Sequence, residues 1–100
     1  YSQDFKETRS RLGSPDIALI PIGAYAPRWF MSFSHVNPSE AVQIAEDLGA
    51  EVAYGMHWGT FPLTDEEVLE PPLLLESALE AKSLPKEFFR TLKPGEVVKF

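Results

Sequence analysis

Two short apolar segments on either side of a helix-like stretch constrain the fold more than any other feature of the sequence. Residues 17–20 are continuously apolar and too few for a helix, which is typical of a strand buried on both faces. Asn37 precedes a proline and stands three residues before Glu40, a start signal for a capped helix that Gly49 ends. Residues 50–56 are then predicted to form a second strand. A strand, a crossover helix and another strand make a parallel unit, so the predicted class is α/β.

The flanking sequence predicts shorter elements around this unit. A helix is expected over residues 2–13, and a capping box at residues 64–67 is expected to open a helical turn. Pro71 and Pro72 should interrupt that turn, after which a helix restarts at Pro72. Residues 85–92 are predicted to form a helical turn, and residues 97–100 a closing strand.

Composition limits the classes of partner and site. The chain has 100 residues, enough for one domain or part of one, and contains no cysteine, which excludes disulfides and thiolate metal ligands. It has two histidines, so any metal must also use carboxylate oxygens, and a three-histidine site cannot come from this chain. The net charge of −6 argues against nucleic acid as a partner. No apolar stretch approaches the about twenty residues of a transmembrane helix.

The histidines are the first candidates for chemistry. His57 directly follows the second predicted strand, and the carboxyl ends of strands are where α/β folds bind ligands. A lone histidine beside a tryptophan is also often a packed structural residue, so both interpretations stay open. His35 stands in a loop just before a helix cap, where it is either functional or a hydrogen-bonded loop residue.

Residues 23–37 form an aromatic-rich connection without clear periodicity, predicted to be a long loop that passes over a pocket. Arg28 lies in it, and no lysine or arginine occurs between Arg28 and Lys82. An arginine among aromatics either clamps a carboxylate or phosphate or covers apolar surface. Trp29 is expected to contact the core, a second subunit or an apolar substrate.

The segments IPIGAYAPRWFMSFSHVNPSEAV and MHWGTFPLTDE together resemble the C-terminal part of metallo-β-lactamase-fold hydrolases. Within that fold the likeness is to the N-acyl-phosphatidylethanolamine-hydrolysing phospholipase D group and its bacterial relatives, and it covers nearly the whole chain. The resemblance implies an α/β fold that is the C-terminal half of an αββα sandwich, with residues 1–100 as one part of that domain. The family's His-x-His-x-Asp-His run and its bridging aspartate are not in this sequence, and Asp4 does not match that aspartate. The chain is therefore expected to begin just after them.

The same resemblance implies roles for single residues. His57 matches the family's last metal-binding histidine, and His35 matches a histidine that faces the active site and is expected to assist catalysis. Tyr25, Arg28 and Trp29 match a loop beside the substrate channel and are expected to bind substrate. The parent enzyme would hold two zinc ions and attack a phosphodiester, or another ester of an N-acyl-phosphatidylethanolamine-like substrate, with metal-activated hydroxide. This chain alone, with one such ligand, is expected to be inactive.

Partners and location follow from the same comparison. The expected partners are the N-terminal half of the same domain, a second copy of the chain and a lipid or small phosphodiester substrate, with no nucleic acid. The expected location is cytoplasmic, with membrane association of the parent as an open point. An alternative of another class is a stand-alone α/β binding or assembly module in which both histidines are structural.

Overall fold

The computed structural model of the chain describes residues 1–23, 25–26, 28–31, 35–56, 58, 69–92 and 95–98. Its elements are α1 (Asp4–Leu12), β1 (Ile17–Pro21), α2 (Arg28–Met31), α3 (Pro38–Leu48), β2 (Val52–Met56), α4 (Glu70–Ala81), a 3₁₀ turn (Lys86–Phe88) and β3 (Phe89–Thr91). The predicted capping box at residues 64–67 lies outside the described residues.

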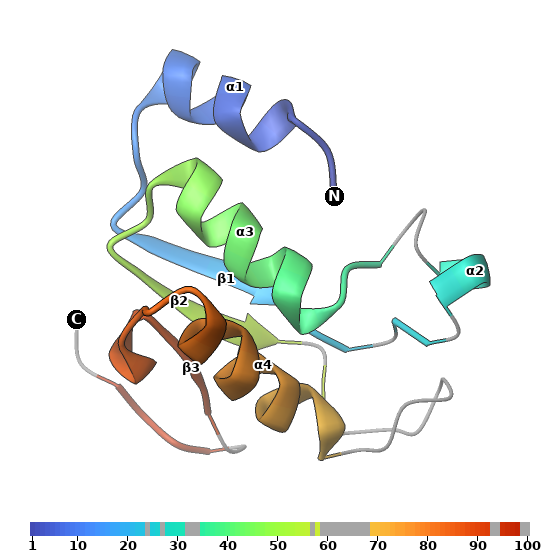
Figure 1. Cartoon of the computed structure of the whole chain (residues 1–100). Coiled ribbons are helices and arrows are strands. Elements are labelled where there is room, and N and C mark those ends of the chain that lie inside the picture. The colour runs from blue at the N-terminus through green and yellow to red at the C-terminus, as the bar shows by residue number, and fades with distance from the viewer. Residues whose placement is uncertain are drawn as a thin grey trace.

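The three strands form one parallel sheet in the order β1-β2-β3. Strands β1 and β2 pair in register from Ile17 with Val52 to Pro21 with Met56, and Phe89 of β3 pairs with Ala53. Helices α3 and α4 lie together on one side of the sheet, and α1 lies beside α3 (Figure 1). The α/β class and the parallel strand–helix–strand unit are confirmed.

Helix α3 begins and ends where its sequence signals predict. The side chain of Asn37 accepts a 2.8 Å hydrogen bond from the Glu40 amide, while Oε1 of Glu40 accepts a 3.1 Å bond from the Asn37 amide. At the other end Gly49 takes a left-handed conformation with φ 70°, which a residue without Cβ adopts at no steric cost. The predicted capping box is therefore present, and it fixes the first turn of α3.

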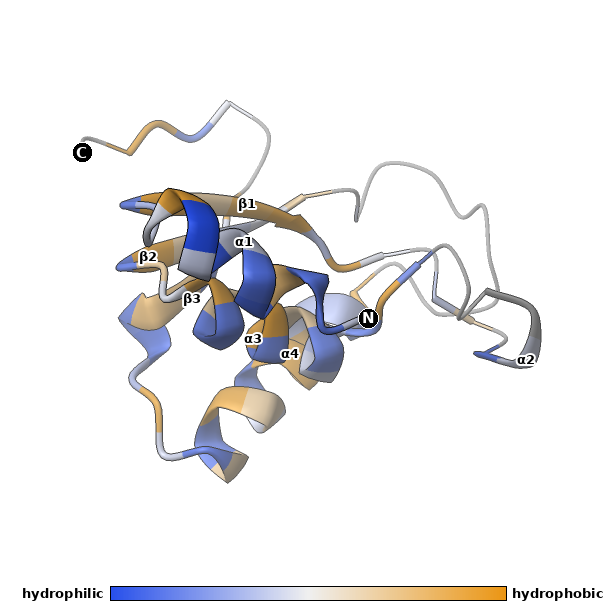
Figure 2. Cartoon of the chain, turned by 90° about the horizontal axis from the view of Figure 1, so that it is seen from above, coloured by the Kyte–Doolittle hydropathy of each residue, from blue (hydrophilic) through white to orange (hydrophobic). Residues whose placement is uncertain are grey.

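The core lies between the sheet and these helices. Ala18 and Ile20 of β1 are buried there, but Leu19 between them is 66% exposed. The expectation of a strand buried on both faces is wrong for this residue, because within the described part of the chain the helices cover one side of the sheet. Successive side chains of a strand point to opposite faces, so Leu19 faces away from the helices. Figure 2 shows helices α1, α3 and α4 on the same side of the hydrophobic strand β1.

Two predictions for the C-terminal third are corrected. The helical turn predicted for residues 85–92 is limited to the 3₁₀ turn Lys86–Phe88. Strand β3 follows it, because Phe89 is buried at 2% exposure and joins the sheet beside Ala53. Val97 and Val98 carry no strand, and Val97 is 86% exposed. The predicted helix restart at Pro72 is confirmed within two residues, because Pro71 and Pro72 lie in the first turn of α4, where no hydrogen-bond donor is needed. The turn that they were expected to interrupt lies outside the described residues.

Candidate functional site

The carboxyl ends of β1 and β2 meet at one edge of the sheet. Pro21 and Met56, the last residues of the two strands, are paired, and the Ile22 amide donates a 3.0 Å bond to the Met56 carbonyl. His57 follows Met56 in the sequence but lies outside the described residues. Its neighbour Trp58 is partly buried and packs against the core. The sheet edge predicted for ligand binding is therefore present.

Arg28 binds groups of its own chain. Its Nη1 donates to the backbone carbonyls of Tyr25 at 3.4 Å and His35 at 3.2 Å, and its Nη2 lies 2.5 Å from Oε1 of Glu40. The same Glu40 oxygen caps α3, so one carboxylate serves both contacts. Arg28 was expected either to bind a carboxylate or phosphate or to cover apolar surface. In the described geometry it binds a carboxylate, which is that of Glu40 in the same chain.

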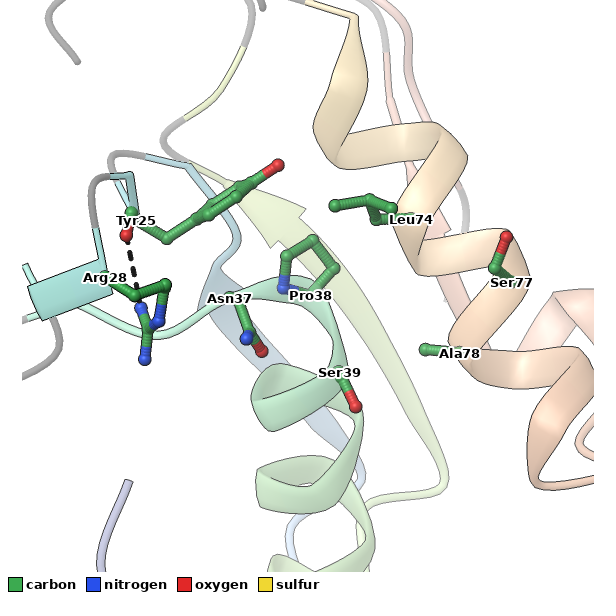
Figure 3. Close-up of a pocket in the computed structure, with 8 residues that line it drawn as sticks. All are labelled: Tyr25, Arg28, Asn37, Pro38, Ser39, Leu74, Ser77 and Ala78. Carbon is green, nitrogen blue, oxygen red and sulfur yellow. Dashed lines mark hydrogen bonds between the residues drawn. The ribbon is translucent and has the colours of Figure 1, made fainter. Parts of the chain in front are cut away.

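Tyr25 connects the same segment to α4. Its side chain is 4% exposed, and its hydroxyl donates a 2.7 Å hydrogen bond to Oε1 of Glu70, the first residue of α4. Tyr25 and Arg28 both line a cavity of about 360 Å³ between α2, α3 and α4, which Figure 3 shows with Leu74 and Ser77 on its α4 side.

Trp29 and His35 lie elsewhere. Trp29 is 81% exposed on α2, which projects away from the sheet and its covering helices (Figure 1). His35 is partly buried and lines a different cavity of about 430 Å³, together with Phe5 and Pro21. The structure thus joins Tyr25, Arg28 and the backbone of His35 in one hydrogen-bonded group. The two cavities described above do not bring together the four predicted residues that the structure describes, and His57 lies outside the described residues.

The described residues contain no group of three or more histidine, cysteine, aspartate or glutamate side chains that could hold a metal ion. A hydrolytic zinc site normally needs three protein ligands. The described part of the chain therefore does not fit a metal ion by itself, and further ligands would have to come from other residues.

Sequence reasoning missed two residues of this group. Glu40 was recognised as a helix cap but not as the partner of Arg28, although a lone arginine ahead of an acidic cap was a usable signal. Glu70 had no local signal, because it lies 45 positions from Tyr25 and only the fold brings them together.

Comparison with known proteins gives the wider context. The family described as "Beta-lactamase superfamily domain" matches residues 1–58. The N-acyl-phosphatidylethanolamine-hydrolyzing phospholipase D 1 of Caenorhabditis elegans is 44% identical over 94% of this chain, which corresponds to 27% of that protein. The mitochondrial N-acyl-phosphatidylethanolamine-hydrolyzing phospholipase D of Saccharomyces cerevisiae is 42% identical over 80% of the chain and 18% of its own length. A metal-dependent hydrolase of Aeropyrum pernix is 35% identical over 86% of the chain and 30% of its own length.

The chain thus spans between 18% and 30% of the length of these three relatives. The family match covers more than half of the chain and includes the parallel unit and the first residues after it. Together with the α/β fold and its three parallel strands, this match shows that the chain belongs to the metallo-β-lactamase superfamily and carries part of that domain.

Proposed function

We propose that this chain is the C-terminal part of a metal-dependent hydrolase that cleaves a phosphodiester or other ester bond of N-acyl-phosphatidylethanolamine-like substrates. The observation that carries the proposal is the 44% identity to a phospholipase D of that specificity over 94% of the chain. A second, more distant relative is named a metal-dependent hydrolase, which supports the reaction class independently of the lipid.

Within this proposal His57 supplies one ligand to a metal centre at the carboxyl edge of the sheet. Strands β1 and β2 end side by side at Pro21 and Met56, which supports a site at this edge. Zinc is the proposed metal, with two ions in the complete site, and its remaining ligands lie outside this chain. Such ions supply Lewis-acid activation of the bond to be cleaved.

His35 is the proposed catalytic helper, and the connection that carries Tyr25, Arg28 and Trp29 is the proposed border of the substrate site. His35 has the imidazole that proton transfer or hydrogen bonding to a phosphate oxygen requires. Trp29, being 81% exposed, is available to an apolar substrate. Among the described residues no helix is long and apolar enough to cross a bilayer. We propose that the protein acts in the cytoplasm and meets lipid substrates at a membrane surface.

The remainder of the superfamily domain is the proposed main partner. The side of the sheet away from the helices presents Leu19 at 66% and Met56 at 48% exposure, which supports the packing of a further layer there. A second copy of this chain is the alternative occupant.

The decisive experiment uses the complete reading frame that encodes this chain. We expect the purified protein to contain zinc by elemental mass spectrometry and to hydrolyse N-acyl-phosphatidylethanolamine in mixed micelles. We expect His57→Ala to lose metal and turnover together, while His35→Ala keeps its metal and loses turnover. A His57→Ala protein with normal zinc content and lower thermal stability would instead assign His57 a structural role and overturn the proposal.

A further inference from the structure

Arg28 and Tyr25 together connect α2, α3 and α4, the helices that come after the carboxyl ends of β1 and β2 in the chain. Arg28 contacts Glu40 in the first turn of α3, and Tyr25 contacts Glu70 at the start of α4. The two residues are also joined to each other, because Nη1 of Arg28 donates to the Tyr25 carbonyl (Figure 3). These four residues, Tyr25, Arg28, Glu40 and Glu70, are called the loop clamp below.

The Arg28 guanidinium links the two ends of the connection between β1 and α3. The carbonyls of Tyr25, near the beginning of this connection, and of His35, near its end, accept from the same Nη1. Bringing the two ends of a flexible connection together costs conformational entropy, and the hydrogen bonds of Arg28 offset part of this cost. A planar guanidinium with five donors can bind several acceptors at once, which a lysine ammonium on a flexible stem does less well.

Glu40 gives the clamp a fixed base. Its Oε1 accepts both the Asn37 amide and Arg28, so the guanidinium is attached to the capping box of α3. The next residues of that helix, Ala41 and Val42, are fully buried against the sheet. The position of the carboxylate is therefore set by the core rather than by the loop.

Tyr25 extends the clamp to the second connection. Glu70 is the first residue of α4, where the chain returns after the segment that contains His57. The Tyr25 ring is buried at 4% exposure, and its hydroxyl reaches Glu70 at 2.7 Å. Tyr25 lies in the connection from β1 to α3, and its hydroxyl is hydrogen-bonded to the end of the connection from β2 to α4. One residue thus links the two connections that leave the carboxyl edge of the sheet.

We propose that Tyr25 and Arg28 are positioning residues that hold the segment carrying His35 against the starts of α3 and α4. In this role Arg28 acts on the chain itself, and it acts on the substrate only through the placement of the loop. The link to turnover depends on the proposed function, whereas the clamping of the loop does not.

Hydrogen exchange of the native protein tests the Arg28 branch, using the complete reading frame. Arg28→Met keeps the aliphatic stem and removes every donor, so amide exchange in the peptide 25–37 should accelerate about tenfold. Glu40→Gln keeps an oxygen for the capping box but removes the charge of a pair whose side chains are 35% and 31% exposed. It should accelerate exchange about two- to fivefold, as expected for a partly exposed pair. The double variant should match Arg28→Met.

Arg11→Gln is the matched control, because the Arg11–Glu7 pair on α1 is 2.7 Å long and has no contact with the loop clamp among the described residues. It should leave exchange in peptide 25–37 unchanged. The inference is overturned if Arg28→Met leaves this peptide's exchange unchanged, or if the Arg28 and Glu40 effects add in the double variant. It is also overturned if exchange rises equally throughout α3 and α4, since Arg28 would then support the whole fold.

Tyr25→Phe tests the second branch by removing one hydroxyl from a ring that stays buried. We expect faster exchange at the start of α4 and in peptide 25–37, with the thermal midpoint of the whole protein nearly unchanged. Ser77→Ala is the control, because Ser77 lines the same cavity while its hydroxyl donates to the Leu73 carbonyl of its own helix, and it should change neither peptide. Unchanged exchange in Tyr25→Phe overturns this branch.

Turnover separates positioning from substrate binding. With N-acyl-phosphatidylethanolamine in mixed micelles, Arg28→Met should lower kcat about 10- to 100-fold at unchanged zinc content, as a misplaced catalytic group does. Glu40→Gln should show the same change to a smaller extent although it never touches substrate. A rise in KM alone in Arg28→Met, with Glu40→Gln normal, would assign Arg28 to substrate binding and overturn the inference. If no variant or parent hydrolyses the lipid while the exchange results hold, the proposed function fails and the clamp remains.

Discussion

Asp47 is the one buried charged side chain among the described residues, at 7% exposure on α3. Its carboxylate accepts a hydrogen bond from the Tyr1 hydroxyl and another, at 2.9 Å, from Nε2 of Gln43. Gln43 in turn accepts a 2.7 Å bond from Lys82. Burial by itself raises the pKa of Asp47, but the hydrogen bonds and nearby lysines outweigh it and hold the pKa below its ordinary value.

We expect Asp47→Asn to destabilise the protein at pH 7 by about 1 kcal/mol, because two donors lose an ionised acceptor. The pKa of Asp47 is lower in the folded state than the about 3.9 of an unfolded aspartate. The stabilisation by its charge is therefore complete above that pH and is lost as the pH falls through the folded value. Urea denaturation should show the full difference between the two proteins at pH 7 and a smaller one at pH 3, below the ordinary value. An equal difference at both pH values would contradict this account.

Gly55 marks a close approach between β2 and the residue after β1. A Cβ built at Gly55 would lie 2.7 Å from Cδ1 and 3.2 Å from Cγ1 of the fully buried Ile22. We expect Gly55→Ala to destabilise the protein by about 1 kcal/mol, since the isoleucine must shift within a packed core. Adding Ile22→Val removes the clashing Cδ1, so the double variant should be more stable than the sum of the two single effects predicts. Strict additivity in thermal denaturation would show that the contact is not responsible.

At the scale of elements, α4 shows how one helix divides between core and surface. Leu75 and Leu79 are buried at 3% and 2% exposure, while Leu73 in the same helix is 64% exposed. Helical spacing places the first two on the face toward the sheet and α3. The sequence marked this helix correctly because its apolar residues repeat at the helical period.

We expect Leu79→Ala to destabilise the protein by about 2–5 kcal/mol, the usual range for a leucine deleted from a packed core. Leu73→Ala, the matched control in the same helix, should change stability by less than about 0.5 kcal/mol. Chemical denaturation with both variants checks the pair. Similar losses in the two variants would mean that another part of the protein covers Leu73.

The elements that could be predicted from the sequence are those with local signals. The capping box of Asn37 and Glu40 and the left-handed Gly49 set the bounds of α3, and both are short-range chemistry. β3 was missed because Phe89 joins the sheet through a partner far away in the sequence, Ala53, which no local pattern encodes. Of the candidate site, the position of Arg28 beside an acidic cap could have been predicted, whereas the contact of Tyr25 with Glu70 depends on the assembled fold.

At the scale of the whole molecule, the sheet is covered by helices on one side only within the described residues. Leu19 and Met56 are exposed on the other side, and α1 contributes no buried residue of its own. An α/β sheet of this kind is usually covered on both faces. The chain is therefore expected to associate when it is produced alone.

We expect sedimentation velocity of the 100-residue chain to show self-association, driven by the exposed Leu19 and Met56 on the side of the sheet away from the helices. Leu19→Lys should shift the distribution toward monomer, and Leu12→Lys, an exposed residue at the end of α1, should not. A compact monomer for the unaltered chain would contradict the expectation.

We also expect the chain alone to bind zinc weakly and to lack hydrolase activity. The physical reason is the ligand count, since the described residues hold no group of three metal-binding side chains. Equilibrium dialysis against zinc provides the measurement. Tight binding of one ion per chain would show that these residues suffice.

The in-register pairing of Pro21 with Met56 has a consequence for how this sequence can change over generations. Substitutions on the outward side of α3 leave the alignment intact, so that surface is free to drift. Gain or loss of one residue between Gly49 and Val52 would instead displace β2 by about 3.3 Å and turn its inward side chains outward. Substitutions in this crossover should therefore be tolerated far more easily than insertions or deletions.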